Sequence, residues 1–315
     1  MTPEQLARDA ARLVDRLEHE QVRRIRTHID SVRREANELI RGMNLRDTST
    51  SRAIREARAR ALVAQSNAAD RILEIARPGS PIAQAEMANI RRAYEDGMRS
   101  ATVAVRDRLA AAGVDASDVL TAFAPRVDLE LVNAITRSTL TTLERVAARG
   151  LAGLEDAIVR GAVRGAGPRV TARLVRESLD LTRYEAERIT RTVYMRAAND
   201  ARDHVFEDAE VRFVQADATN DARLCDYCAA RHGMVYRVQD APDFPLHPQC
   251  RCVLLPWAED TPVSQRGDAY YQRERKEISE QPDRERVTAR ARAPFERADD
   301  REAPKPVWAP GRGWL

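Results

Sequence analysis

Apolar residues recur every three or four positions over most of the chain up to Asp208, which is the spacing of amphipathic helices. The first pattern starts at Thr2 and Pro3, a favourable N-cap and first helical residue. A polar run over 46–50 ends it. A helix of roughly 40 residues spans about 60 Å, so we expect it to pack lengthwise against another helix. Its stripe comprises Leu6, Ala10, Leu13, Leu17, Gln21, Ile25, Ile29, Val32, Ala36, Leu39 and Met43.

Further helices are predicted in series. The pattern favours helices over 53–76, from Ser80 to Leu109, over 115–123, and from a cap at Asp128 to Val146, then over 168–179 and 183–208. Together with the helix that starts at Pro3, the first two of these make three long helices in succession, which suggest an antiparallel bundle. Glycines weaken the pattern between 150 and 167, and they lack the spacing of a phosphate-binding loop. We interpret these glycines as marks of short helices and caps.

The pattern changes after residue 210. Alternating or continuous apolar runs predict short strands over 211–216, 234–238 and 252–255. Beyond Trp257 the chain is rich in charge and proline, and few apolar residues recur with any period. That composition is typical of a disordered tail.

Composition narrows the picture. Of the 315 residues 32% are charged, but the net charge is only +3, so no large cationic surface is implied. The sequence shows neither a secretory leader nor a run of apolar residues long enough to span a membrane. We therefore expect a protein made in a reducing cytosol, where clustered cysteines are more often metal ligands than disulfides.

All four cysteines lie in two pairs, each with a short spacing. Cys225 and Cys228 are separated by two residues, as are His247 and Cys250, and these four residues are our predicted tetrahedral Zn²⁺ ligands. Cys252 is the competing fourth ligand, because on a strand it would share a face with Cys250. Buried thiols or two disulfides are the alternative interpretation.

A closed four-ligand site stabilises structure, because catalytic zinc keeps a position open for water or substrate. No His-x-Glu precedes Cys225, which excludes a zinc deaminase. A zinc-stapled nuclease would need further ligands, for which His232 with Asp240 or Asp243 is a weak candidate set. No catalytic residues are predicted.

The predicted fold class is therefore mainly α, with a long-helix N-terminal bundle, a small zinc-stapled α+β module and a disordered C-terminal tail. We divide the chain into an extended helical region over 1–125, a helical plus zinc-stapled β module over 126–258, and a charged tail over 259–315.

The stretch from about Leu151 to Trp257 resembles the phage head morphogenesis, or minor capsid, proteins typified by protein F of phage Mu. Asp-x-Arg-x-Cys-x-x-Cys combined with His-Pro-x-Cys-Arg-Cys carries the resemblance. The remaining matching residues are Arg188, Arg191, Thr192 and Asn199 on a helix, Asp221, Arg223, Gly233, Val235 and Tyr236. Val193 departs from the family, whose members commonly have glutamate there.

The resemblance implies a non-enzymatic virion component, present in few copies at the portal vertex inside the prohead. Its implied partners are the portal protein, and further the scaffold and major capsid proteins and phage DNA, but no membrane. A salt bridge from the matching arginines Arg188, Arg191 and Arg223 to the Asp221 region is our favoured role for them, with DNA contact second.

Overall fold

The structure, a computed structural model, describes residues 3–46, 48–111, 126–218 and 224–257. The predicted helix over 115–123, the tail over 259–315 and the motif residues Asp221 and Arg223 lie outside these described residues. Within the described part, no helix is long and apolar enough to cross a membrane.

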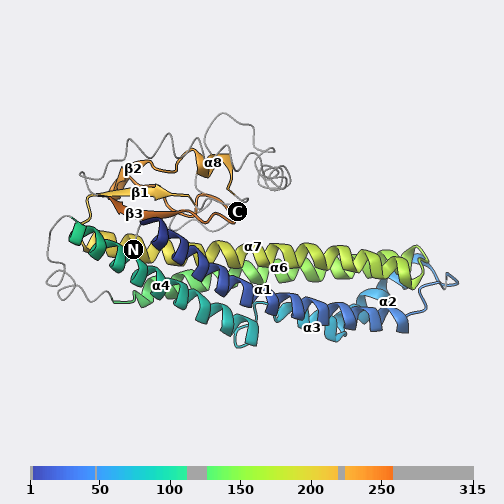
Figure 1. Cartoon of the computed structure of the whole chain (residues 1–315). Helices are drawn as coiled ribbons and strands as arrows, with labels where there is room; N and C mark the ends of the chain where they lie inside the picture. Colours follow the sequence, from blue (N-terminus) through green and yellow to red (C-terminus); the bar gives the residue numbers. More distant parts are fainter. Residues whose placement is uncertain (1–2, 47, 112–125, 219–223, 258–315) are drawn as a thin grey trace. The chain divides into compact units, whose positions relative to one another are not determined.

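The described chain is mostly helical, with a small antiparallel sheet near its C-terminal end, which confirms this part of the predicted fold class (Figure 1). The longer helices are α1 (Pro3–Gly42), α4 (Pro81–Ala111), α6 (Leu129–Val163) and α7 (Pro168–Asp208). The shorter ones are α2 (Arg52–Ala64), α3 (Asn67–Leu73), α8 (Asp226–Ala229) and the 3₁₀ turn η1 (Val238–Asp240). The strands are β1 (Phe213–Asp217), β2 (Val235–Arg237) and β3 (Val253–Trp257).

The residues group into two compact units, and all four of the longer helices contribute to both. Of the described residues, the helical unit comprises 17–46, 48–90 and 133–191, and the mixed unit comprises 3–16, 91–111, 126–132, 192–218 and 224–257. This grouping does not follow the predicted domain boundaries at 125 and 258, which stay a prediction.

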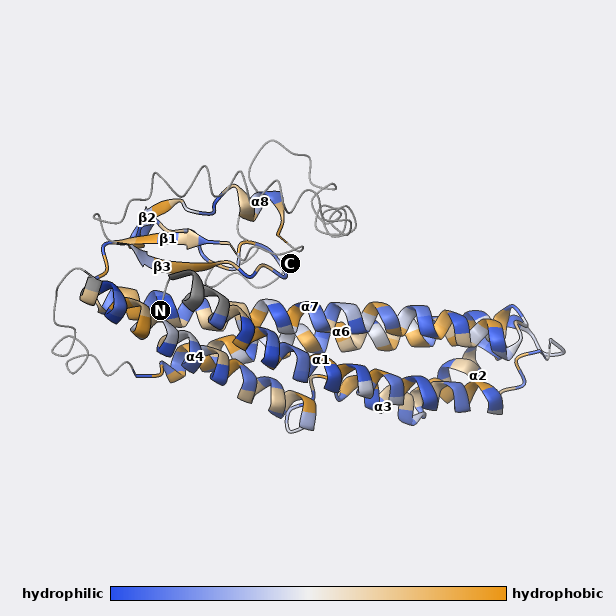
Figure 2. Cartoon of the chain, viewed as in Figure 1, coloured by the Kyte–Doolittle hydropathy of each residue, from blue (hydrophilic) through white to orange (hydrophobic). Residues whose placement is uncertain are grey.

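The helical unit buries the apolar stripe of α1. Ile25, Ile29 and Val32 are fully buried, as the three-to-four spacing predicts. Figure 2 shows the matching separation of apolar and polar residues along the long helices. Gln21, the polar member of the stripe, is also fully buried, and its side-chain amide donates to the Ile82 carbonyl at 3.2 Å. That bond satisfies the amide nitrogen of Gln21, whereas its buried Oε1 has no hydrogen-bond partner among the described residues.

One predicted helix is in fact two. The pattern over 53–76 divides into α2 and α3, because the Ser66 hydroxyl accepts a hydrogen bond from the Ala69 N–H and caps α3. The apolar period continues through the break, so the spacing alone predicted a single helix. A serine N-cap is the local signal that marks the second start.

The glycines between 150 and 161 lie inside a helix, which contradicts their interpretation as caps. α6 starts where Asp128 accepts from the Leu131 N–H, at 2.9 Å, and it continues to Val163. A Cβ added at Gly150 would lie 2.7 Å from Thr182 Oγ1 of α7, and Gly153 and Gly161 meet Ser178 and Thr171 in the same way. These glycines therefore let α6 and α7 approach closely, and that outweighs their poor helix propensity.

The two helices predicted over 168–179 and 183–208 are also a single helix, α7. No glycine or proline separates them, and Asp180 does not cap a new start. Its carboxylate instead accepts from the Arg33 guanidinium at 2.9 Å and lies 3.5 Å from Arg183.

The mixed unit contains the sheet, whose strand order is β2-β1-β3 with both pairings antiparallel. All three predicted strands are confirmed, with ends shifted by one or two residues. β1 alternates between half-buried and buried residues, whereas β3 is buried over Val253–Pro256. In the same unit α4 and α7 meet at Gly97, where an added Cβ would overlap the Ala198 carbonyl oxygen.

Candidate metal centre

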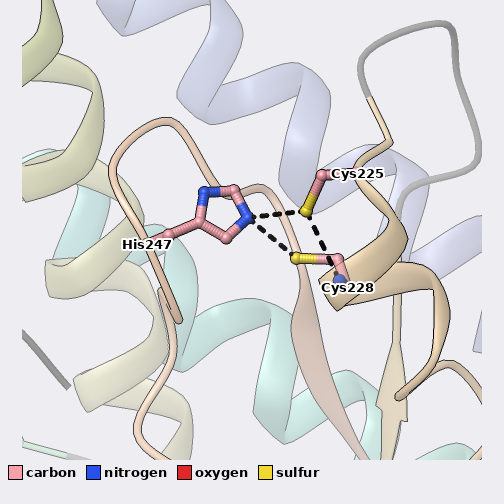
Figure 3. A group of neighbouring side chains, drawn as sticks. All are labelled: Cys225, Cys228 and His247. Carbon is pink, nitrogen blue, oxygen red and sulfur yellow. Dashed lines mark hydrogen bonds between the residues drawn. The ribbon is translucent and has the colours of Figure 1, made fainter. Parts of the chain in front are cut away.

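Two cysteines are presented by a single helical turn, α8. Cys225 is the N-cap of this turn, with an extended backbone, and its Sγ accepts from the Cys228 N–H at 3.4 Å. The cap bends the chain so that the Sγ atoms of Cys225 and Cys228 lie on one side of the turn (Figure 3). Two intervening residues are therefore enough to bring both sulfurs to one point.

A histidine from the following loop points at both sulfurs. His247 Nε2 lies 3.1 Å from Cys225 Sγ and 3.0 Å from Cys228 Sγ (Figure 3). The other ring nitrogen, Nδ1, lies 2.8 Å from the Pro248 carbonyl oxygen. With a metal bound, donation from Nδ1–H to that carbonyl would leave the Nε2 lone pair for the metal, which is the tautomer that a metal-ligating histidine adopts.

The last two cysteines reach the cluster from the chain before and at the start of β3. Cys250 Sγ lies 3.6 Å from Cys228 Sγ, and the Cys250 N–H donates to the His247 carbonyl at 3.0 Å. Cys250 and Cys252 are both buried. The potential ligand atoms form two groups, Cys225 with Cys228 and His247, and Cys228 with Cys250 and Cys252, each within 4.8 Å. Cys228 belongs to both groups.

Helix α7 anchors the loop that carries His247 and Cys250. Thr192 Oγ1 accepts from the Gln249 N–H at 3.3 Å, and the Asn199 amide donates to the Cys252 carbonyl at 3.3 Å. Thr192 and Asn199 are seven residues apart, so they lie two turns apart on one face of α7. Thr192 belongs to the predicted motif, and this contact gives it a structural role.

The close contacts within the cluster shift the pKa values of the cysteine thiols in opposite directions. A hydrogen bond with Cys228 lowers the pKa of Cys225 to about 4, whereas contacts with Cys225 and Cys250 raise the pKa of Cys228 far above its usual value. Burial alone would lower the pKa of His247, but contact with Cys225 and the nearby thiolate charges raise it to about 9. Thiolates this close repel one another unless a cation or proton lies between them.

The donor set fits a tetrahedral zinc ion. Ligands at the usual Zn–S distance of about 2.3 Å are separated by about 3.7 Å along the edges of a tetrahedron. The Cys228–Cys250 sulfur–sulfur separation of 3.6 Å is close to that value, and the two sulfur–nitrogen separations, 3.0 and 3.1 Å, are shorter. The four cysteines are free, and 3.6 Å is far longer than a disulfide of about 2.05 Å. Soft thiolates with one imidazole are the ligands that zinc prefers.

The weaker histidine set predicted for a nuclease is arranged differently. His232 Nδ1 accepts from the Ala218 N–H at 3.1 Å and lies 3.3 Å from the Asp217 carboxylate. Asp243 lies 3.8 Å from the Arg196 guanidinium, and Asp240 ends η1. Within the part of the chain that the structure describes, His232 does not join a group of three potential metal ligands.

The motif arginines are placed on α7. Arg191 is largely buried and pairs with Glu18 of α1, with 2.5 Å between Nη2 and Oε2. This partner was missed by the sequence analysis, because nothing in the local spacing relates residues 18 and 191. Arg188 is half-buried on the same helix. The predicted salt bridge to the Asp221 region involves residues outside the described part of the chain.

The sequence analysis also missed the contact of Arg251 with Asp15, which lies 3.8 Å away, and the buried Arg202, which donates to Ser100 Oγ at 2.8 Å. Arg251 stands between two cysteines, and that position was the one local signal available. Arg202 is surrounded by ordinary helix-forming residues, so the sequence around it gives no sign of its burial.

The fold and the cluster together define a class of mainly helical protein with a small sheet beside a Cys/His group. Residues 152–255, about a third of the chain, match the model of a family described as Phage Mu protein F like protein. The match confirms the resemblance predicted from the motifs and is consistent with a phage head morphogenesis protein. No curated protein and no solved structure matches the chain.

Proposed function

We propose that this protein is a minor capsid protein that acts in phage head morphogenesis at the portal vertex, during prohead assembly and DNA packaging or ejection. The observation that carries the proposal is the family match over 152–255, which contains all five cluster residues together with Thr192 and Asn199. Its proposed partners are the portal protein, with scaffold protein, major capsid protein and phage DNA as further contacts, and its proposed location is the virion.

The proposed role of the Cys/His cluster is a structural zinc site, with Cys225, Cys228, His247 and Cys250 as ligands. When bound, zinc would link α8 to the loop before β3. A filled tetrahedral set leaves no position for a substrate, and this supports a non-enzymatic role. A three-stranded sheet has a small core, so such a link replaces hydrophobic burial that the module lacks.

The function is tested by co-expressing the protein with the portal, scaffold and major capsid proteins of its own phage, then purifying proheads. Quantitative mass spectrometry should find the protein in few copies per particle. The control is Arg52→Gln, a substitution of an exposed residue outside the matched segment. This variant should be incorporated into proheads in the same amount as the wild-type protein. Proheads that consistently exclude the wild-type protein would overturn the proposal.

A further inference from the structure

A pocket of about 480 Å³ lies within the mixed unit, where the end of α7 meets the sheet. Glu207 comes from the last turn of α7, and Arg237, Val238 and Gln239 come from the end of β2 and from η1. Val211, Arg212 and Phe213 complete the lining. β2 is an edge strand of the sheet, as Figure 1 shows. The volume is within the range of sites that hold small organic ligands.

Two arginines line this pocket, and they differ from the arginines of the protein that are paired with carboxylates. Arg191 and Arg196, for example, are paired with carboxylates at 2.5 and 2.6 Å. Arg212 and Arg237 are exposed, and neither forms an ion pair with any residue in the described ranges. Two guanidinium groups on one pocket offer several N–H donors and two positive charges to an incoming anion.

The backbone holds these two arginines in register. Phe213 pairs with Arg237 across β1 and β2, and the Val238 N–H donates to the Arg212 carbonyl at 3.2 Å. Arg212 directly precedes β1 and Arg237 is the last residue of β2, so the backbones of the two arginines lie beside each other at one end of the sheet. This is a more rigid support than a loop would provide.

The rest of the lining is suited to more than a bare anion. Val211, Phe213 and Val238 give an apolar surface, and the Phe213 ring is held edge-on against Trp257, with ring centres 5.7 Å apart. Glu207 and Gln239 offer hydrogen-bond acceptors, and Gln239 also offers donors. A ligand that matches all of these groups carries a phosphate, an apolar or aromatic part, and hydroxyl or amino donors.

We propose that this pocket binds a nucleotide unit, with Arg212 and Arg237 on its phosphate and the sugar and base over the apolar lining. A free nucleotide and one nucleotide within a single strand of nucleic acid both offer this combination of phosphate, sugar and base. A carboxylate of an acidic peptide would satisfy the arginines, but it would leave most of the pocket volume and its aromatic surface unused. The inference does not depend on the proposed function, because it is measured on the purified protein alone.

The test uses the full chain and measures binding at low ionic strength, where phosphate contacts are strongest. Calorimetry with deoxyadenosine 5′-monophosphate, deoxyadenosine and inorganic phosphate tests which parts of a nucleotide are recognised. Fluorescence anisotropy with a labelled thymidine hexanucleotide separates a nucleotide in a strand from a free one. A labelled glutamate-rich hexapeptide tests the peptide alternative.

The variant R212Q/R237Q should weaken binding of the nucleotide or the hexanucleotide by about tenfold or more, because each charge-assisted hydrogen bond is lost. R52Q/R58Q removes the same charge from exposed positions on α2 and should change binding less than about twofold. Circular dichroism melting should show both variants folded, because all four arginines are exposed. Failure of both nucleotide probes to bind, equal losses in the two variants, or preference for the acidic peptide would each overturn the proposal.

Discussion

At the residue scale, Cys228 occupies the centre of the Cys/His cluster. It is buried, its Sγ lies near both His247 and Cys250, and it belongs to both groups of potential ligands. Five donors are thus present for the four positions of a tetrahedral ion. His247 and Cys252 compete for one of these positions.

Metal content distinguishes the two ligand sets. We expect about one zinc per chain in native mass spectrometry, and its loss in Cys225→Ser and in Cys228→Ser. With the proposed set, His247→Ala should also lose zinc, whereas Cys252→Ser should retain it. His204→Ala is the matched control, because His204 lies on α7 and pairs with Asp208. Full zinc in both the Cys225 and Cys228 variants would contradict the site. Retention of zinc in His247→Ala together with its loss in Cys252→Ser would favour a four-cysteine set.

Two half-buried aspartates on α7 give the protein a pH-dependent stability. Burial raises the pKa of Asp200 to about 6 and that of Asp203 to about 7. Arg196 pairs with Asp200 at 2.6 Å and counteracts part of this effect. The Asp203 carboxyl lies near the charges of Asp200 and Asp243, which raise its pKa, and near those of Arg196 and Arg202, which lower it.

Replacing Asp203 with Asn should stabilise the protein at high pH. An unfolded aspartate ionises near pH 3.9, so between about pH 4 and 7 the unfolded state loses its proton while the folded state retains it. Stability of the wild type therefore falls as pH rises through this range. Asp203→Asn lacks this loss, so its advantage over the wild type in free energy of unfolding should be about 2.5 kcal/mol larger at pH 8 than at pH 5.

Urea unfolding at pH 5 and pH 8 measures the effect of Asp203→Asn. The exposed Asp156, which pairs with Arg160 one turn along α6, supplies the control Asp156→Asn. The free energy of unfolding of that variant should differ from that of the wild type by nearly the same amount at both pH values. A loss of stability in Asp203→Asn at pH 8 would show that the ionised carboxylate makes a favourable interaction.

At the scale of elements, the close approach of α4 and α7 depends on Gly97. A Cβ there would overlap the Ala198 carbonyl oxygen and lie 2.8 Å from the Ala198 Cα, so the backbones of both helices would have to move. Gly97→Ala should therefore lower the free energy of unfolding by about 2 kcal/mol, although alanine has the better helix propensity.

Thermal denaturation of Gly97→Ala should be compared with that of Gly42→Ala. Gly42 is the last residue of α1, and nothing lies within 4 Å of an added Cβ there. The control should be neutral or slightly stabilising, because only the helix propensity changes. Equal melting temperatures for the two variants would mean that the helices separate at no cost.

Much of the element structure follows from local patterns. The stripe of α1 and the alternation of β1 predicted their elements, because burial on one face imposes the period. The continuity of α6 was not predictable, because Gly150 and Gly161 are poor helix formers. Glycine is needed at these positions because Thr182 and Thr171 of α7 pack directly against them. Tertiary contact overrides local propensity at these positions.

The candidate site shows the same division between local and distant information. The spacing of Cys225, Cys228, His247 and Cys250 indicated a shared cluster, because two-residue separations bring side chains together locally. The contacts of Thr192 with Gln249 and of Arg191 with Glu18 join residues distant in sequence, and a single sequence holds no record of such pairs.

At the scale of the whole molecule, the family match and the Cys/His cluster coincide in one part of the chain. The matched segment, 152–255, begins in α6, includes all of α7 and ends inside β3. The cluster therefore lies in the part of the chain that is similar to known head proteins, and the first 151 residues lie outside the match. On the strength of this match we propose that the protein is attached at the portal vertex.

The most direct test of that claim is the dependence of incorporation on the portal. Proheads assembled with scaffold and major capsid proteins, with and without the portal, are purified, and this protein is quantified in each by mass spectrometry. The account predicts few copies per particle when the portal is present and a loss to background when it is omitted. Equal amounts in both kinds of particle would contradict attachment at the portal vertex.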